Sequence, residues 1–255
     1  MIKTSNLNKD KNCIKLASWN INKFESSPIS EISKVIVDES PDIIFLQEFP
    51  TFYIHKFTNE INDISLNQYE IISQQSLYEK DYNITLVLIK ENLKEHIKII
   101  PMLEDMPLKL RLIELELSIN NKSINILGLH CPIYVNSKDN VKRSKQIDMF
   151  WDKLIAYSNS KNLMLIGDFN VNLLNQNKFT GHMKNIISNG YIDLDSEAKQ
   201  NTFIADTRID YILMHNSLAD LNNEYTLITP KYIQDNPSDV FNYSDHKMII
   251  TEIAL

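Results

Sequence analysis

Short runs of apolar residues recur from one end of the chain to the other, each bounded by polar or turn-forming residues. The runs are rich in Ile, Leu and Val and are shorter than a typical buried helix. Their length and composition therefore predict buried β-strands. The predicted strands cover residues 14–19, 42–47, 69–72, 84–89, 97–100, 111–117, 123–129, 162–166, 209–214 and 248–253.

Two segments between these runs have the periodicity of amphipathic helices. Residues 28–40 place Ile29, Ile32 and Ile36 on one face, and residues 138–157 form the second pattern. The first part of the chain alternates strand and helix, and the middle part runs through successive strands without a linker. This order predicts a mixed α/β sandwich.

Composition supports one domain. The chain has 255 residues, of which 43% are hydrophobic, which is enough for one well-packed core. We therefore expect a single domain over residues 1–255, in which the polar residues 1–12 form a flexible lead-in. No apolar stretch is long enough to cross a bilayer and the N-terminus has no apolar signal-peptide centre, so a cytoplasmic location is predicted. No feature indicates an obligate protein partner.

The net charge and the cysteine content exclude few classes of function. The net charge of −7 argues against a groove that binds nucleic acid by charge alone, although a bound divalent cation could supply positive charge locally. The two cysteines, Cys13 and Cys131, are too few for a disulfide framework or a thiolate zinc site. Cys131 follows His130, so it is either a catalytic thiol or, as we favour, a small buried residue.

Polar residues capable of chemistry stand directly after several predicted strands. A carboxylate is costly in the middle of a sheet, but at a strand end it can be held rigidly and still face a cleft. We therefore expect a site at one edge of the sheets. Its members would be Asn20, Glu48, His130, Asp168 and, two positions later, Asn170.

Two further segments could reach the same edge. Asp245 and His246 precede the last predicted strand, so an antiparallel direction would bring them there. Asp210 lies inside the predicted strand 209–214, where a carboxylate needs a partner, and a histidine is the natural one.

These residue types point to metal-assisted phosphoester chemistry. Carboxylate and amide oxygens suit Mg²⁺, with Mn²⁺ as a substitute, better than zinc, which prefers His and Cys. Histidines among carboxylates supply general acid–base groups. Phosphoester cleavage needs a positioned water, neutralised phosphoryl charge and help for the leaving group.

Six short motifs contain these residues: SWNIN at 18–22, FLQE at 45–48, LGLHCP at 127–132, IGDFN at 166–170, RIDYIL at 208–213 and YSDH at 243–246. Together they resemble the endonuclease/exonuclease/phosphatase superfamily, which includes DNase I-like nucleases, exonuclease III-like enzymes, inositol polyphosphate phosphatases and bacterial sphingomyelinases. The resemblance implies a four-layer α/β sandwich, in which two mixed β-sheets pack face to face and are flanked by helices.

The resemblance also implies a role for each residue on the metal and water side. Glu48 would bind the catalytic metal, with Asn20 assisting nearby and Asp245 at the metal edge. Asp168 would orient or deprotonate the attacking water, and Asn170 would hold the scissile phosphate.

The remaining motif residues would bind the phosphate group or influence substrate choice. Asp210 would orient the imidazole of His246, which would contact the phosphate or act as a base. His130 aligns with the histidine of DNase I-like and phosphatase members, where abasic-site enzymes carry Tyr, and this argues against abasic-site repair. Substrate contacts are expected from Arg111, Arg143 and Asn22.

Three hypotheses for function remain. The favoured one is a Mg²⁺-dependent nuclease with nucleic acid as substrate, and the alternative is a phosphatase or phosphodiesterase that acts on a lipid or small phosphoester. A non-catalytic binding module is disfavoured, because no expected catalytic residue is missing. Two clusters could either bind substrate or be structural. The aromatic residues Phe49, Phe52, Tyr53 and Phe57 could stack on bases, but we favour the core face of a helix for them. The cations Lys138, Lys142, Arg143 and Lys145 could follow a phosphate backbone or form a solvated helix face.

Overall fold

The computed structural model describes residues 13–25, 27–66, 68–73, 83–133, 141–195, 201–218, 223–228 and 244–255. The expected lead-in at residues 1–12 lies outside these ranges. Within them the backbone forms two six-stranded mixed sheets, as predicted for the sandwich.

The first sheet has the order β11-β12-β1-β2-β4-β3. Its one parallel pair is β1 with β2, and its other neighbours in the described chain are antiparallel. Its strands are β1 (Cys13–Asn20), β2 (Ile43–Pro50), β3 (Tyr69–Ile72), β4 (Asn83–Lys90), β11 (Asn223–Ile228) and β12 (Met248–Ala254).

The second sheet has the order β5-β6-β7-β8-β10-β9. It likewise contains one parallel pair among the described strands, β7 with β8. Its strands are β5 (Ile97–Ile100), β6 (Leu112–Ile119), β7 (Lys122–His130), β8 (Leu163–Asp168), β9 (Tyr191–Asp193) and β10 (Asp210–His215).

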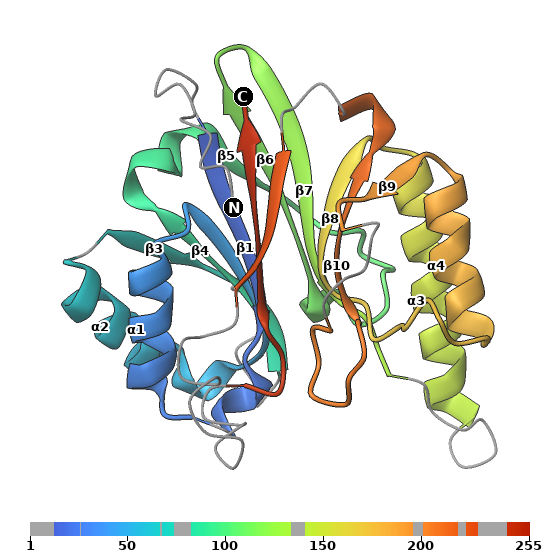
Figure 1. The fold of residues 1–255 in the computed structure, drawn as a ribbon, viewed down its shortest axis with the longest axis horizontal. Helices are drawn as coiled ribbons and strands as arrows, with labels where there is room; N and C mark the ends of the chain where they lie inside the picture. Colours follow the sequence, from blue (N-terminus) through green and yellow to red (C-terminus); the bar gives the residue numbers. More distant parts are fainter. Residues whose placement is uncertain are drawn as a thin grey trace, which may run out of the picture.

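The helices cover the outer faces of the two sheets, which gives the expected four layers (Figure 1). A parallel strand pair needs a crossover, and α1 (Ile29–Glu39) joins β1 to β2 just as α3 (Val141–Asn159) joins β7 to β8. Next to them lie α2 (Ile54–Ser65) and α4 (Lys178–Ser188). Short 3-10 helices are Asn22–Phe24, Thr51–Tyr53, Glu91–His96, Lys109–Arg111 and Asn216–Leu218.

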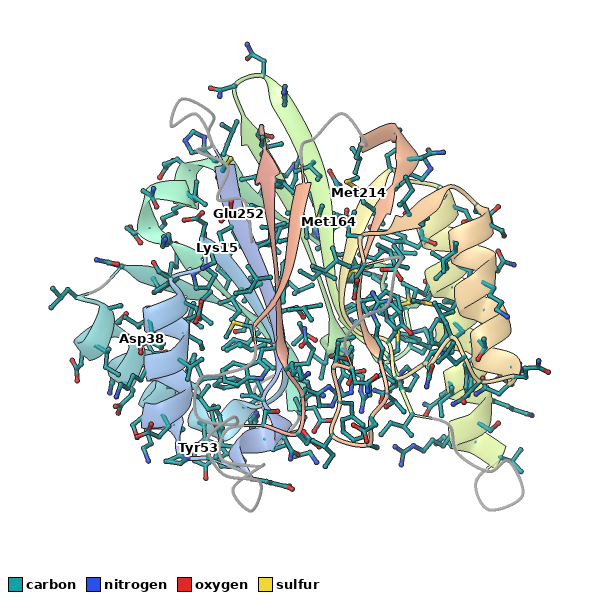
Figure 2. The ribbon with its side chains drawn as sticks, in the orientation of Figure 1. Lys15, Asp38, Tyr53, Met164, Met214 and Glu252 are labelled. Carbon is teal, nitrogen blue, oxygen red and sulfur yellow. The ribbon has the colours of Figure 1, made fainter. Side chains whose placement is uncertain are left out.

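Three apolar clusters hold the layers together. One fills the space between the sheets and includes Met164 and Met214 from β8 and β10, which Figure 2 labels. The second lies between the second sheet and α3 with α4, and the third between the first sheet and α1 with α2. Ile29, Ile32 and Ile36 are buried in the third cluster, which confirms the predicted face of α1.

The boundaries of some elements differ from the sequence prediction. Arg111 ends a short 3-10 helix instead of leading β6, and Asp210 is the first residue of β10 instead of lying inside it. The predicted helix 138–157 is α3, with residues 138–140 outside the described ranges. Phe49 and Phe57 pack edge to face in the core, as favoured, whereas Phe52 is 61% exposed.

Gly128 of β7 allows the two sheets to approach closely. A Cβ atom at this position would overlap the ring of Phe45, which extends from β2 in the opposite sheet and is fully buried. Because the Phe45 ring is enclosed, it cannot move aside without disturbing the cluster between the sheets.

The substitution Gly128→Ala is therefore expected to lower the free energy of unfolding by roughly 1 to 3 kcal/mol through overpacking. The matched control is Gly181→Ala in α4, where a Cβ meets nothing within 4 Å and should raise stability by about 0.5–1 kcal/mol. Urea unfolding followed by circular dichroism measures both changes. Equal stabilities for the two variants would contradict this account of the sheet packing.

Candidate active site

The residues predicted at strand ends gather at one end of the sandwich. Asn20, His130 and Asp168 are the last residues of β1, β7 and β8, and Glu48 lies near the end of β2. These four strands are the two parallel pairs, so their carboxyl ends meet at the same edge.

Asp168 is held by amide groups on both of its carboxylate oxygens. Its Oδ1 accepts from Asn170 N at 2.8 Å, and its Oδ2 accepts from Asn20 Nδ2 at 3.0 Å and Asn170 Nδ2 at 3.1 Å. Gly167 precedes it with φ +146°, and a Cβ there would overlap the carbonyl oxygen of Leu129. The tight approach of β8 to β7 therefore requires glycine directly before the carboxylate.

Asp210 and His246 form a buried pair beside Asp168. Nδ1 of His246 lies 3.0 Å and 3.2 Å from the two carboxylate oxygens of Asp210. Its Nε2 lies 3.9 Å from Asp168 Oδ2 and 4.0 Å from Asp245 Oδ1. The imidazole thus presents one nitrogen to Asp210 and the other to the remaining carboxylates.

Glu48 faces this group from a strained point of β2. Its φ is +54°, and the pairing of β2 with β4 shifts register between Leu46 and Phe49. A left-handed backbone costs a residue such as Glu roughly 1 to 3 kcal/mol, and bulges of this kind often aim side chains at active sites. Glu48 Oε1 lies 3.5 Å from His130 Nε2, and its Oε2 lies 3.4 Å from Lys23 Nζ.

Three contacts at this edge join one sheet to the other. In each, one residue belongs to the first sheet or the segment leading into it, and the other belongs to the second sheet. The site therefore exists only when the two sheets are packed in their observed alignment. The three contacts are Asn20 with Asp168, His246 with Asp210, and Glu48 with His130.

The environment moves the pKa values of Asp168 and His246 in ways that suit acid–base chemistry. The pKa of Asp168 is raised to about 7, mainly by burial and further by the charge of Asp210, while the charge of His246 opposes the shift. Burial lowers the pKa of His246, but the charges of Asp210 and Asp168 outweigh it and raise the pKa to about 10. His246 is therefore a cation at neutral pH.

The pKa of His130 shifts in the opposite direction to that of His246. Burial lowers its pKa well below the usual value, and the positive charges of Arg111 and His246 lower it further. The two histidines of the site thus differ in charge near neutral pH, with His130 neutral and His246 protonated.

Glu48 and Asp245 form the more accessible side of the site. Their side chains are 17% and 24% exposed, in contrast to 2% for Asp168. Burial raises the pKa of Asp245, and the nearby charge of Glu48 raises it further. Two hard oxygen donors that repel one another suit a divalent cation such as Mg²⁺. Asn20 lies against Asp168, and its Oδ1 accepts from Asn22 N.

The other predicted substrate residues take different positions. Nη1 of Arg111 lies 3.4 Å from His130 Nε2, at the same edge of the sheets. Arg143 lines a neighbouring cavity on α3. Asn22 follows the end of β1, with a left-handed backbone at φ +46°. Asn170 directs both of its amide hydrogens inward, to Asp168 Oδ2 and to the carbonyl of Cys131.

A sequence model of the Endonuclease/Exonuclease/phosphatase family matches residues 17–246. The chain belongs to this family. Its members are phosphoester hydrolases, as the strand-end motifs predicted. No significant match was found among curated protein sequences.

Solved structures of the same fold include several members of this group. AP endonuclease LMAP from Leishmania major superimposes with a TM-score of 0.71 at 12% identity, over 100% of this chain and 91% of that chain. D. rerio TDP2 complexed with single strand DNA product gives 0.64 at 14% identity, over 96% and 100% of the two chains. A family protein from Leptotrichia buccalis gives 0.59 at 18% identity, over 95% and 100%.

In the described part of the chain, none of the helices has the length and apolar character that crossing a membrane requires.

Sequence reasoning missed the residues that support this family's site in the present chain. Thr202 Oγ1 accepts from the backbone N–H groups of Ile209 and Asp210, and the ring of Phe203 lies 4.8 Å from that of His246. Trp19 Nε1 donates to the carbonyl of His246 at 3.0 Å. No local pattern identifies these contacts, because the partners are distant in sequence or belong to the backbone.

Arg208 has a structural position although it adjoins a catalytic motif. Its Nη1 and Nη2 each donate to one carboxylate oxygen of Asp193 at 2.7 Å, and its guanidinium lies 4.3 Å from the ring centre of Tyr211. The pair joins the start of β10 to β9, so it supports the segment that carries Asp210.

Cys131 is buried, and its thiol does not have the setting of a nucleophile. Burial raises its pKa well above the usual value, and the charge of Asp168 raises it further. A thiol that remains protonated and enclosed is unreactive. The structural interpretation favoured for Cys131 is consistent with this environment.

We expect an aromatic disulfide reagent to modify one thiol of the native protein, the exposed Cys13, and both thiols after unfolding. The absorbance of the aromatic thiolate that the reagent releases gives the number of modified thiols. The native Cys13→Ser variant should release no aromatic thiolate. Rapid modification of Cys131 in that variant would contradict the assignment of an inert thiol.

Proposed function

We propose that this chain is a Mg²⁺-dependent phosphodiesterase that hydrolyses DNA or RNA by attack of an activated water. The observation that carries the proposal is the position of Asp168. Its carboxylate, with a pKa of about 7, lies beside the cationic His246 and the neutral His130, next to the Glu48–Asp245 side of the edge. A general base with a pKa near the operating pH is the most effective kind.

Glu48 and Asp245 would hold the metal, with Mn²⁺ as a possible substitute for Mg²⁺. When bound, the ion would neutralise charge on the phosphoryl oxygens. Asp168, Asp210 and His246 also offer ligand atoms within 4.8 Å of one another. We assign that cluster to proton transfer instead, because Nδ1 of His246 already contacts Asp210 and the carboxylate of Asp168 already accepts three hydrogen bonds from Asn20 and Asn170.

Asp168, Asp210 and His246 would carry out proton transfer and phosphate binding. Asp168 would take a proton from the attacking water, and Asn170 and Asn20 would keep its carboxylate oriented. Asp210 holds His246 by Nδ1, so Nε2 is available to donate to a phosphoryl oxygen. The phosphate contact expected from Asn170 would need one of its two inward hydrogen bonds to be exchanged.

Nucleic acid is favoured as the substrate by two considerations. The similar structures include an AP endonuclease and a TDP2 with a single-strand DNA product. Cationic side chains, including Arg111, also lie next to the catalytic edge of this chain. Hydrolysis of sphingomyelin, phosphoinositides or simple diesters, with plasmid, single-stranded DNA and RNA left intact, would instead support the lipid or small-molecule alternative.

Replacing Asp168 or His246 by Ala is expected to lower turnover at least about a hundredfold on a verified substrate, because each removes a proton-transfer group. The control is Asp38→Ala, an exposed carboxylate on the outer helix α1 that is labelled in Figure 2. Steady-state rates on the substrate panel provide the measurement. A small loss in the Asp168 or His246 variants would mean that the roles are misassigned.

Removal of divalent cations should abolish hydrolysis, and Mg²⁺ or Mn²⁺ should restore it, since the accessible Glu48–Asp245 side offers only oxygen donors. Glu48→Gln should raise the Mg²⁺ concentration that gives half-maximal activity, and isothermal titration with Mg²⁺ should detect weaker binding directly. Full activity in excess chelator would refute metal dependence.

A further inference from the structure

A cavity of about 410 Å³ opens beside the catalytic edge. It lies between the start of α3, the short 3-10 helix before β6 and the segment that follows β7. Its volume is within the range of pockets that hold small ligands or one unit of a larger one. It is lined by Leu108, Arg111, Pro132, Lys142, Arg143, Gln146 and Ile147.

The charged side chains among the described residues that line this cavity are all cations. Arg111, Lys142 and Arg143 contribute to its wall, and no carboxylate belongs to the described residues that line it. Burial is the main cause that lowers the pKa of Arg111; the charges of Glu48 and Asp168 on its catalytic side raise this pKa, and the positive charge of Arg143 on the cavity side lowers it. Cations gathered in one hollow on a chain whose net charge is −7 favour an anionic occupant.

Arg111 connects the cavity to the catalytic residues. The same guanidinium that lines the cavity lies 3.4 Å from His130 Nε2 and 3.5 Å from the carbonyl oxygen of Cys131. His130 in turn lies 3.7 Å from Asp168 Oδ2. A group bound in the cavity would therefore lie beside the phosphate that is being cleaved.

We propose that this cavity binds a second phosphate group of the substrate, adjacent along the strand to the phosphate that is hydrolysed. The inference rests on the proposed nuclease function and deepens it, because it makes a second phosphate the feature that the enzyme selects. Planar guanidinium groups suit phosphate oxygens, and Lys142 adds a point charge. A diester with one phosphate would leave the cavity without its anion.

The helix α3 offers a matched comparison. Lys142, Arg143 and Lys145 are all exposed cations within its first turns, but only the first two line the cavity. A general electrostatic effect of the helix would depend on all three side chains alike. A specific phosphate site depends on Lys142 and Arg143 and does not depend on Lys145.

The test uses three thymidine dinucleotides, all with one internal phosphodiester: one without terminal phosphate, one with a 5′-phosphate and one with a 3′-phosphate. For the wild-type enzyme with Mg²⁺, we expect one of the two terminal phosphates to raise kcat/KM by about tenfold or more, the scale of a charge-assisted hydrogen bond. Arg143→Ala and Lys142→Ala should each lower that ratio several-fold. Lys145→Ala should leave it unchanged.

The outcomes distinguish failure of the phosphate site from failure of the proposed nuclease function. If neither terminal phosphate helps, or if Lys145→Ala lowers the ratio as much as Arg143→Ala, the phosphate site is refuted while the nuclease function stands. If the wild type leaves every dinucleotide and longer strand intact but hydrolyses another phosphoester, the nuclease function fails and the phosphate site falls with it. Circular dichroism confirms that each variant is folded.

Discussion

The carboxylate of Asp168 is almost completely buried at the seam where the two sheets meet, and the rest of the site is arranged around it. An ion in such a place is costly unless hydrogen bonds compensate it. Asn20 supplies one donor from the first sheet and Asn170 supplies two from the chain that continues β8. These hydrogen bonds do not fully offset the cost of burying the charge, so the pKa of Asp168 is raised. The raised pKa makes the carboxylate basic enough to accept a proton near neutral pH.

Since the carboxylate accepts hydrogen bonds from donors on both sheets, the proposed catalysis requires the observed alignment of the sheets. Close packing at Gly128 against Phe45 and the apolar cluster between the sheets determine that alignment. The pair of Asp210 and His246 spans the same seam, so a displacement of one sheet would separate both contacts together. The interior of the sandwich therefore orients groups that lie at its end, and packing substitutions there should affect the site without touching it.

Much of this arrangement could be predicted from sequence, because it depends on local patterns. Apolar runs identified the strands, and polar residues directly after them located Asn20, His130 and Asp168 at one edge. Contacts between distant backbone and side-chain groups could not be predicted. Thr202 binds the N–H of Asp210, and both amide hydrogens of Asn170 turn inward. Neither leaves a periodic signal, since each depends on how loops meet after the sheets have packed.

The three arginines of the chain have different surroundings although their side chains are chemically identical. Arg208 binds a carboxylate through both of its Nη atoms, and that carboxylate is the protein's own Asp193. Arg111 and Arg143 instead border a hollow whose described lining residues include no carboxylate. The difference lies in what each guanidinium meets: Arg208 is fixed by the carboxylate of Asp193, whereas Arg111 lies against His130 and is influenced by the charges of Glu48 and Asp168. A guanidinium fixed in a bidentate ion pair is part of the scaffold, whereas one that borders an open cavity is also placed to meet an anion of the proposed substrate.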